Sequence, residues 1–305
     1  MDAALFYSVT FYAAIALPFA VCVLLAPLEQ AFPRRAGQRP LAPRWRVNMA
    51  LAAGATALAV AAGAWATPWL GAAGARAGLF SLAALDIPGP VKFIAGLLLI
   101  DLAMFALHVL SHRIAPLWRL HRVHHSDDEF DASTGLRHHA LEALVNICVL
   151  TFFYGLIGMP FAVIAVYGVL VAVHSVLSHA NIAIAPRVDR VLRLFIVTPD
   201  MHRLHHSADA REYDSNYSQI FPWWDWLFRT FRAKPVELQT KMQLGLDKDE
   251  NMAKASALRL TLSPFKNIAS NALPETRRPL GSRPAVAASA RRNRSAGAKR
   301  KRRVP

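Results

Sequence analysis

The longest uncharged stretch of the sequence runs from residue 143 to residue 186 and contains no Asp, Glu, Lys or Arg. A helix crosses the hydrocarbon core of a bilayer with about 20 residues, so this stretch is about twice as long as one span requires. Gly155, Gly158 and Pro160 interrupt it near its middle, where a helix is readily broken. The stretch therefore predicts a helical hairpin that enters a membrane and returns to the same side.

Three further apolar stretches are long enough to span a bilayer. Residues 3–28 and 47–75 carry no formal charge, and 93–111 contains only Asp101 and His108 as strongly polar residues. The first stretch has no basic segment before it and lacks a good cleavage site, so we interpret it as a retained anchor. Because alternating strand patterns are scarce, the fold class predicted is an all-α integral membrane protein with about four transmembrane helices: two single spans, one His-bearing span and one helical hairpin.

Charge distribution predicts the orientation of these spans. The loop 29–46 carries five arginines against one acid, Glu29, which places it in the cytoplasm by the positive-inside tendency. The His-bearing segment that follows residue 112 and the C-terminus then also lie in the cytoplasm. The net charge of +15 owes much to the segment from Arg277 onward, which holds eleven Lys or Arg and no acid. That composition predicts a disordered basic tail, and without a folded basic motif no nucleic-acid partner is expected.

All twelve histidines lie between residues 108 and 206, and two segments repeat the same cluster. The segments RLHRVHHSDD (119–128) and MHRLHHSADA (201–210) share the pattern H-x-x-H-H-S. Spacings of three and four place imidazoles on one helical face, and neutral imidazole binds Fe, Zn, Cu or Ni. Because one ion takes at most six ligands, the number of histidines predicts two metal ions, with one repeat supplying one set of ligands per metal. The cytoplasmic helices are thus expected to form a cap that holds a dinuclear site.

Several motifs in order resemble the fatty acid hydroxylase/sterol desaturase superfamily, whose members are integral membrane di-iron oxygenases. The segments that carry the resemblance are DLAMFALHVLSH, LWRLHRVHHSDDEFDASTGLRHHALE, SHANI, VTPDMHRLHHSADAREYDSNYS and WWDWLFRTF, between about Leu97 and Phe231. The resemblance implies a domain organisation of N-terminal membrane anchor spans (1–92), a catalytic domain (93–234) and a C-terminal extension with the basic tail (235–305). The sequence departs from the family pattern at Ala140, which replaces a proline, and at Ser218 and Arg229, which replace glycines.

The resemblance also implies a set of metal ligands. Because Ala140 stands in the proline position, His139 rather than His138 takes the ligand position, and His174 is a possible additional ligand. Polar residues near the motifs are candidates to orient the ligands, since a ligating imidazole usually donates its other N–H to a carboxylate or carbonyl. The expected ligands are His108, His112, His121, His124, His125, His139, His179, His202, His205 and His206, and the orienting candidates are Asp101, Glu142, Asn181 and Asp200. Arg122 and Arg203, inside the two repeats, are expected to face solvent or lipid phosphate.

By this resemblance the chain is expected to use two iron ions and O2 to hydroxylate or desaturate a C–H bond of an apolar membrane lipid or sterol-like substrate. Electrons would come from a separate donor protein of ferredoxin or cytochrome type, because the sequence has no Rossmann glycine pattern, haem motif or Cys cluster. A bacterial inner membrane is the expected location. Two alternatives stay open on the residues alone: zinc accepts the same ligands, which allows a zinc-dependent membrane hydrolase, and a non-enzymatic metal- or lipid-binding membrane protein is the other.

Overall fold

The computed structural model describes residues 2–37, 40–78, 80–234, 236–246 and 250–266. The basic segment from Arg277 onward lies outside these described residues. Five long or apolar helices are present: α1 (Ala3–Ala31), α2 (Leu41–Arg76), α3 (Gly89–Arg113), α5 (Ala140–Leu156) and α6 (Phe161–Ser178). Four of them, α1, α2, α3 and α6, are long and apolar enough to cross a membrane, and α5 is a shorter apolar helix. The described residues contain no β-strand, only two isolated bridges, so the all-α prediction is confirmed.

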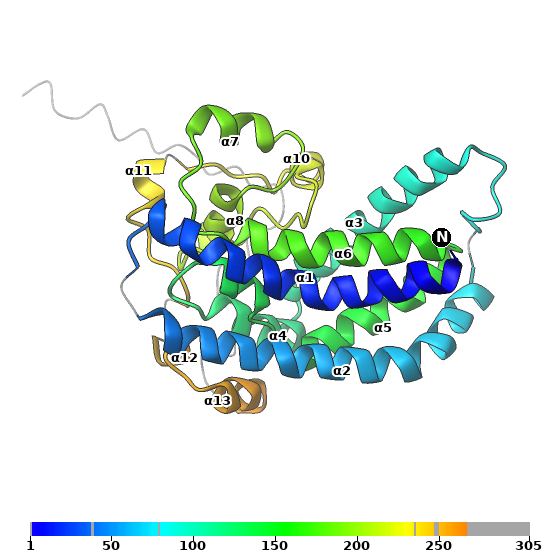
Figure 1. Cartoon of the computed structure of the whole chain (residues 1–305), viewed down its shortest axis with the longest axis horizontal. Coiled ribbons are helices and arrows are strands. Elements are labelled where there is room, and N and C mark those ends of the chain that lie inside the picture. The colour runs from blue at the N-terminus through cyan, green and yellow to red at the C-terminus, as the bar shows by residue number, and fades with distance from the viewer. Residues whose placement is uncertain (1, 38–39, 79, 235, 247–249, 267–305) are drawn as a thin grey trace, which may run out of the picture. The chain divides into compact units, whose positions relative to one another are not determined.

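The long helices pack in two pairs, as Figure 1 shows: α1 lies along α6, and α2 lies along α5. The second pair is close because glycines stand at the crossing. A Cβ atom on Gly74 would lie 2.1 Å from the Phe152 carbonyl oxygen, and one on Gly155 would lie 2.1 Å from the Gly71 carbonyl oxygen. Glycine is therefore required at both positions for the backbones to approach this closely.

The hairpin predicted within residues 143–186 is present as α5, a short turn and α6. Gly158 has φ +54°, a conformation that only glycine adopts without strain, and Pro160 is the N-cap residue of α6. Gly158 is also packed tightly, since a Cβ atom there would lie 2.4 Å from the Ser81 hydroxyl oxygen. The turn thus depends on the same residues whose composition predicted it.

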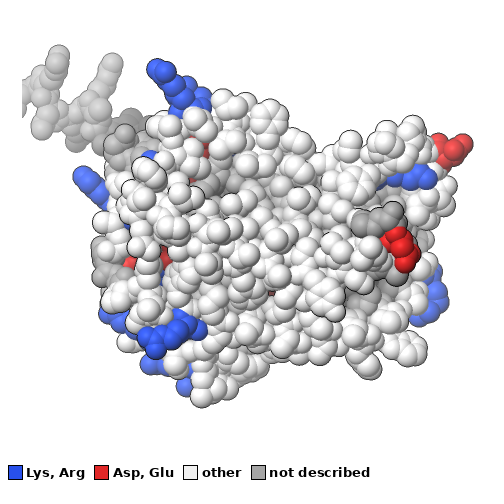
Figure 2. Space-filling model, viewed as in Figure 1, with Lys and Arg blue, Asp and Glu red and all other residues white. Residues whose placement is uncertain are grey.

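Short helices and loops form a cap at the end of the bundle where α3 and α6 end. They are α4 (Ala115–His125), η1 (Ala132–Leu136), α7 (Pro186–Leu192), α8 (Pro199–His205), α9 (Ala210–Tyr213), α10 (Trp223–Leu227), α11 (Val236–Gln239), α12 (Glu250–Ala253), α13 (Ala257–Leu262) and η2 (Ser263–Phe265). Figure 2 shows that Lys, Arg, Asp and Glu lie mainly toward the two ends of the viewed face, with a wide uncharged surface between them. Such a band suits contact with lipid tails.

The N-terminal helices are tied to the cap by buried ion pairs. Arg44, at the start of α2, pairs with Asp127 at 2.8 Å and also with Asp131, and its side chain is only 3% exposed. Glu29, near the end of α1, accepts backbone hydrogen bonds from Ala132 (2.8 Å) and Asn181 (2.7 Å). These contacts anchor the loops on both sides of the His-bearing segments to helices far away in the sequence.

Replacing Arg44 by Met is expected to lower the free energy of unfolding by about 3–5 kcal/mol, because Asp131 would stay buried without its paired arginine and Asp127 would keep only the attraction of Arg137. The thermal unfolding temperature of the detergent-purified protein measures the change. Arg46→Met is the matched control, since Arg46 lies two residues away and is exposed. Equal unfolding temperatures for the two variants would contradict the role assigned to Arg44.

Candidate metal centre

Nine of the twelve histidines gather in two buried clusters. The first cluster contains His108 and His112 from α3, His121 and His125 from α4, and His205 from α8. The second contains His124 from α4, His179 directly after α6, and His202 and His206 from α8 and the residue that follows it. Within each cluster one ligand nitrogen per ring can be chosen so that all lie within 4.8 Å of one another.

The twin H-x-x-H-H motifs do not each build one cluster, so the prediction of one motif per metal is wrong. On α4, His121 and His125 face the first cluster while His124 faces the second, and on α8 the pair His202 and His206 faces the second while His205 faces the first. Successive helical residues point about 100° apart, so adjacent histidines cannot face the same ion. Each motif therefore gives two imidazoles to one cluster and one to the other.

Backbone and carboxylate oxygens fix which ring nitrogens are free in each cluster. A carbonyl or carboxylate oxygen only accepts, so the Nδ1 facing it must carry the proton. His108 donates to the Tyr217 carbonyl (2.7 Å) and His121 to Glu142 Oε1 (2.7 Å). His179 likewise donates to the Ser175 carbonyl (2.6 Å), and His205 to the Ser215 carbonyl (2.7 Å). In each neutral ring Nε2 is left with a lone pair directed into its cluster.

These lone pairs face each other at short distances. Nε2 of His108 lies 3.1 Å from Nε2 of His121 in the first cluster, and Nε2 of His179 lies 3.2 Å from Nε2 of His124 in the second. Two ligands bound at about 2.1 Å to one ion are about 3.0–3.4 Å apart for octahedral or tetrahedral angles. Buried nitrogens without a hydrogen-bond partner among the described residues include both of His112 and Nε2 of His205. The donor set therefore fits one cation in each cluster.

Burial lowers the pKa of several clustered imidazoles and so favours their neutral form. It lowers the pKa of His179 and of His205 to about 3, in each case from 6.5. Burial, followed by the neighbouring histidines, also lowers the pKa of His124, His202 and His206 well below 6.5. Neutral rings are the form that binds a metal ion. These five histidines are thus in their ligating state at neutral pH.

The metal-free protein is expected to lose stability as the pH falls below about 6.5. His179 and His205 bind protons in the unfolded chain near pH 6.5 but in the folded chain only near pH 3, so stability is present above 6.5 and is lost as the pH falls toward 3. Each such histidine lowers the free energy of unfolding by up to about 1.4 kcal/mol per pH unit in that window. Thermal unfolding of chelator-treated protein between about pH 8 and about pH 5 measures this slope. A flat profile would contradict it.

His139 does not lie in either cluster, so its predicted ligand role is not supported by its position. Its Nδ1 accepts the Leu141 backbone N–H at 3.1 Å and caps α5, and its Nε2 donates to the Thr261 carbonyl at 3.0 Å. Both ring nitrogens are thereby used. His138 instead stacks on His124, with ring centroids 4.6 Å apart, and His174 lies on α6 outside both groups. Neither His138 nor His139 therefore belongs to a cluster, although His138 lies against the second one.

Of the four predicted orienting residues, only Glu142 contacts a clustered imidazole. Asp101 accepts hydrogen bonds from Tyr167 Oη, Trp224 Nε1 and two backbone amides of the 220–221 segment. Asn181 exchanges hydrogen bonds with the backbone of Arg35, and Asp200 pairs with Arg34 and Arg203. These three residues therefore hold the surrounding segments in place, and the imidazoles are oriented by main-chain carbonyls that sequence patterns do not reveal.

The two arginines inside the repeats are buried, contrary to the expectation that they face solvent or lipid phosphate. Arg122 is 1% exposed and Arg203 is 0% exposed. Arg203 pairs with Asp200 and donates to the Ala180 carbonyl, and Arg122 contacts the sulfur of Met252. Since each arginine directly follows the first histidine of its motif, it points away from the metal clusters into the packed cap.

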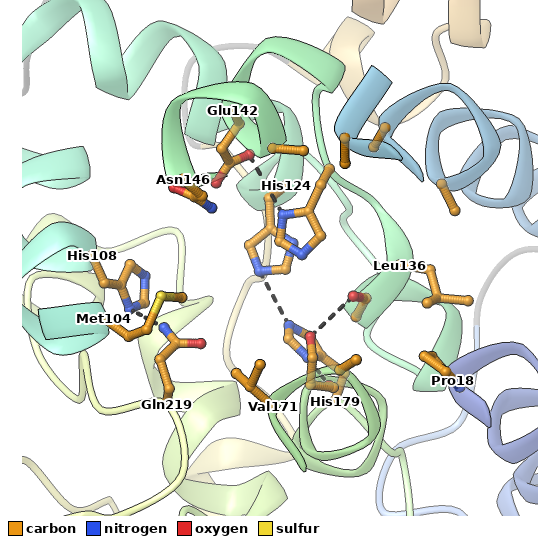
Figure 3. Close-up of a pocket in the computed structure, with 18 of the residues that line it drawn as sticks. Pro18, Met104, His108, His124, Leu136, Glu142, Asn146, Val171, His179 and Gln219 are labelled. Atoms are coloured by element: carbon orange, nitrogen blue, oxygen red, sulfur yellow. Dashed lines mark hydrogen bonds and ion pairs between the residues drawn. The ribbon is translucent and has the colours of Figure 1, made fainter. Parts of the chain in front are cut away.

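A cavity of about 310 Å³ leads from the clusters into the helix bundle. Its lining includes five histidines from both clusters: His108, His121, His124, His179 and His202. Its walls are mostly small or apolar side chains of α1, α2, α3 and α6, among them Ala55, Met104 and Val171, and Figure 3 shows several of these residues around the open space. A molecule with a narrow apolar part could therefore reach the His rings from within the bundle.

Comparison with known proteins identifies the central part of the chain. Residues 93–230 match the fatty acid hydroxylase family model. The chain is 30% identical over 148 residues to the ornithine lipid hydroxylase OlsE of Rhizobium tropici. This alignment covers 48% of this chain and 44% of that protein. It is 29% identical over 157 residues to the alkylglycerol monooxygenase of Caenorhabditis elegans. That alignment covers 49% of this chain and 29% of the relative.

The human alkylglycerol monooxygenase is 27% identical over 149 residues, covering 48% of this chain and 32% of that protein. The match thus spans less than half the length of each of these relatives. No solved structure matches the chain.

Proposed function

We propose that this chain, which belongs to the fatty acid hydroxylase family, is a membrane oxidoreductase that uses O2 to hydroxylate or desaturate a C–H bond of a lipid. The observation that carries the proposal is the pair of buried, neutral His clusters at the end of an apolar cavity. Two iron ions held by the nine clustered histidines would supply the O2 activation that such an oxidation needs. The proposed catalytic domain is 93–234, with 1–92 as the anchor and 235–305 as an extension.

The chain's own residues would bind and orient the lipid. The apolar walls of the cavity would take a hydrocarbon chain and exclude water from the site, while the carbonyls of Tyr217, Ser175 and Ser215 hold the imidazoles in fixed tautomers. Glu142 does the same for His121. The relatives that match over this region include enzymes named for ornithine lipid and alkylglycerol, which supports a membrane lipid as the substrate class.

The distribution of arginines supports a location for the cap and, with it, a source of electrons. The arginines near residues 34–46 favour a cytoplasmic position for the cap, and we propose a bacterial inner membrane as its location. A soluble ferredoxin or cytochrome could then deliver electrons to the cap. Zinc fits the same nitrogens, and a zinc-dependent hydrolase is the competing function.

Lipid mass spectrometry tests the proposal directly. Cells that express the chain are expected to accumulate one lipid class shifted by the mass of one oxygen atom or by the loss of two hydrogens, relative to cells that express His179→Ala. Both strains would carry equal amounts of membrane-inserted protein, checked by immunoblot. An unchanged lipid profile with full iron content in the wild-type protein would contradict the proposed oxidation.

A further inference from the structure

One polar side chain in the cavity wall has a role that the metal clusters do not explain. Asn146 lies on α5, four residues after Glu142 and therefore on the same helical face. Figure 3 shows its amide beside Glu142 at the edge of the cavity. α5 is otherwise strongly apolar, and polar residues at such depths usually face the protein interior and often have a function.

Two neighbouring hydroxyl groups of the cavity wall donate hydrogen bonds within the protein. Ser111 donates to the Leu107 carbonyl at 2.9 Å, and Ser175 donates to the Gly135 carbonyl at 3.0 Å. The Asn146 side chain, by contrast, forms no hydrogen bond with any of the residues that the structure describes. Its donor and its acceptor are both available to a molecule in the cavity.

An unpaired amide discriminates between possible occupants. A plain hydrocarbon chain would displace water from Asn146 and leave its amide unpaired, whereas an ester, amide, ether or hydroxyl group could pair with it. A site that hydrogen-bonds a polar group of its ligand strongly rejects an analogue that lacks the group, because the site's own polar atoms are then left unpaired. An apolar pocket discriminates much less between ligands that differ only in size. Asn146 therefore favours a bound molecule that carries a polar group beside its amide.

The position of Asn146 along α5 indicates how far from the first cluster such a polar group would lie. Four residues along a helix correspond to about 6 Å. Glu142 Oε1 touches Nδ1 of His121 at 2.7 Å, so Asn146 lies about one helical turn beyond the first cluster's orienting carboxylate. A lipid atom bound to Asn146 would hence be only a few bonds from the carbon that faces the imidazoles.

We propose that Asn146 binds the polar linkage of the substrate and that the oxidised carbon lies within a few bonds of an ester, amide, ether or hydroxyl group. The inference rests on the proposed function, because it uses the His clusters as the place of oxidation. It narrows the substrate class to lipids oxidised beside their linkage, as opposed to lipids oxidised in the middle or at the end of a hydrocarbon chain.

Binding measurements test Asn146 without turnover. The purified metal-loaded protein in detergent is titrated with a fatty acid methyl ester and with the alkane of the same length. The wild-type protein is expected to bind the ester at least about tenfold more tightly, and Asn146→Leu, which keeps the size of the side chain, is expected to abolish this preference. Asn146→Gln, which keeps the amide, is expected to restore part of it. Equal preference in wild type and Asn146→Leu would overturn the inference.

The product gives a second, separate readout. Fragmentation mass spectrometry of the accumulated lipid is expected to place the new hydroxyl or double bond beside the polar linkage, and a position far along the chain would overturn the inference while leaving the oxidation in place. If no oxidised lipid forms but the ester preference depends on Asn146, the proposed oxidation fails and the binding role stands. Metal content and unfolding temperature of Asn146→Leu, expected to equal those of the wild type, show that the variant is folded.

Discussion

His205→Ala is expected to remove about one metal ion per chain and to lower product formation by more than about 100-fold. His205 lies in the first cluster, where the Ser215 carbonyl fixes its Nδ1 proton and leaves Nε2 without a hydrogen-bond partner among the described residues. Even groups that only orient a metal-bound histidine contribute about 10- to 100-fold to metal affinity or activity, so the loss of a ligand should cost more. Metal analysis of the detergent-purified protein, together with lipid product yield, measures both effects.

His139→Ala is the matched control for this experiment. The same residue type is removed, but His139 is bound to backbone groups outside both clusters, so the metal content is expected to stay at two ions per chain. If His205→Ala retains both full metal content and turnover, the assignment of the site is wrong. Loss of a metal ion from His139→Ala would instead return His139 to the ligand set.

Ala55→Phe is expected to lower turnover at least about tenfold while both metal ions remain bound. Ala55 is 7% exposed and lines the cavity between α2 and the other helices, so a phenyl ring there would fill part of the roughly 310 Å³ that leads to the clusters. Overfilling a packed site typically costs about 1–3 kcal/mol, and here we expect that cost to appear as weaker binding of the lipid in the cavity. The ratio of product yield to metal content, compared with the wild type, measures the effect.

Ala57→Phe provides the control for cavity filling. Ala57 lies two residues further along α2 and is exposed, so its new ring would face outward and leave the cavity open. Turnover of Ala57→Phe is expected to match the wild type. Equal activity of both phenylalanine variants would show that the lipid reaches the clusters by another route, and metal loss in Ala55→Phe would show that the ring disturbs the site itself.

Features set by local sequence were predictable. The membrane helices follow from uncharged runs, and the turn before Pro160 follows from the conformational freedom of glycine at Gly158, because both depend on residues that are adjacent in the chain. The presence of two His clusters also followed, since twelve imidazoles exceed the needs of one ion. These properties need no knowledge of how distant helices cross.

The partition of histidines between the two clusters depended on tertiary structure. His124 groups with His179, His202 and His206 and not with His121, and a spacing of three residues between His121 and His124 does not predict this, because it depends on where the segments that carry the other histidines lie. The position of His139 outside both clusters has a similar cause. His139 is the N-cap residue of α5 and its ring bonds to Leu141 and Thr261, which turns it away from the clusters.

Buried charges were the other class of residue that sequence reasoning misplaced. Arg122 and Arg203 looked like surface residues because arginine is mostly exposed, yet both lie inside the cap. The pairing of Arg203 with Asp200, and of Arg44 with Asp127 and Asp131, is visible only when distant segments meet. Asn146 did leave a signal, because it is a polar residue within an uncharged run, although that signal alone does not separate a structural role from a binding one.

Metal analysis combined with isotope-labelled O2 tests the central claim most directly. Protein purified without oxygen is expected to contain two iron ions per chain, recognisable by Mössbauer spectroscopy. When it is supplied with a reductant, labelled O2 and the lipid identified in cells, the iron-loaded protein should consume O2 and either place the label in the product or release it as water with formation of a double bond. Two zinc ions per chain and no O2 consumption, with iron loss during purification excluded, would contradict the account and favour the hydrolase.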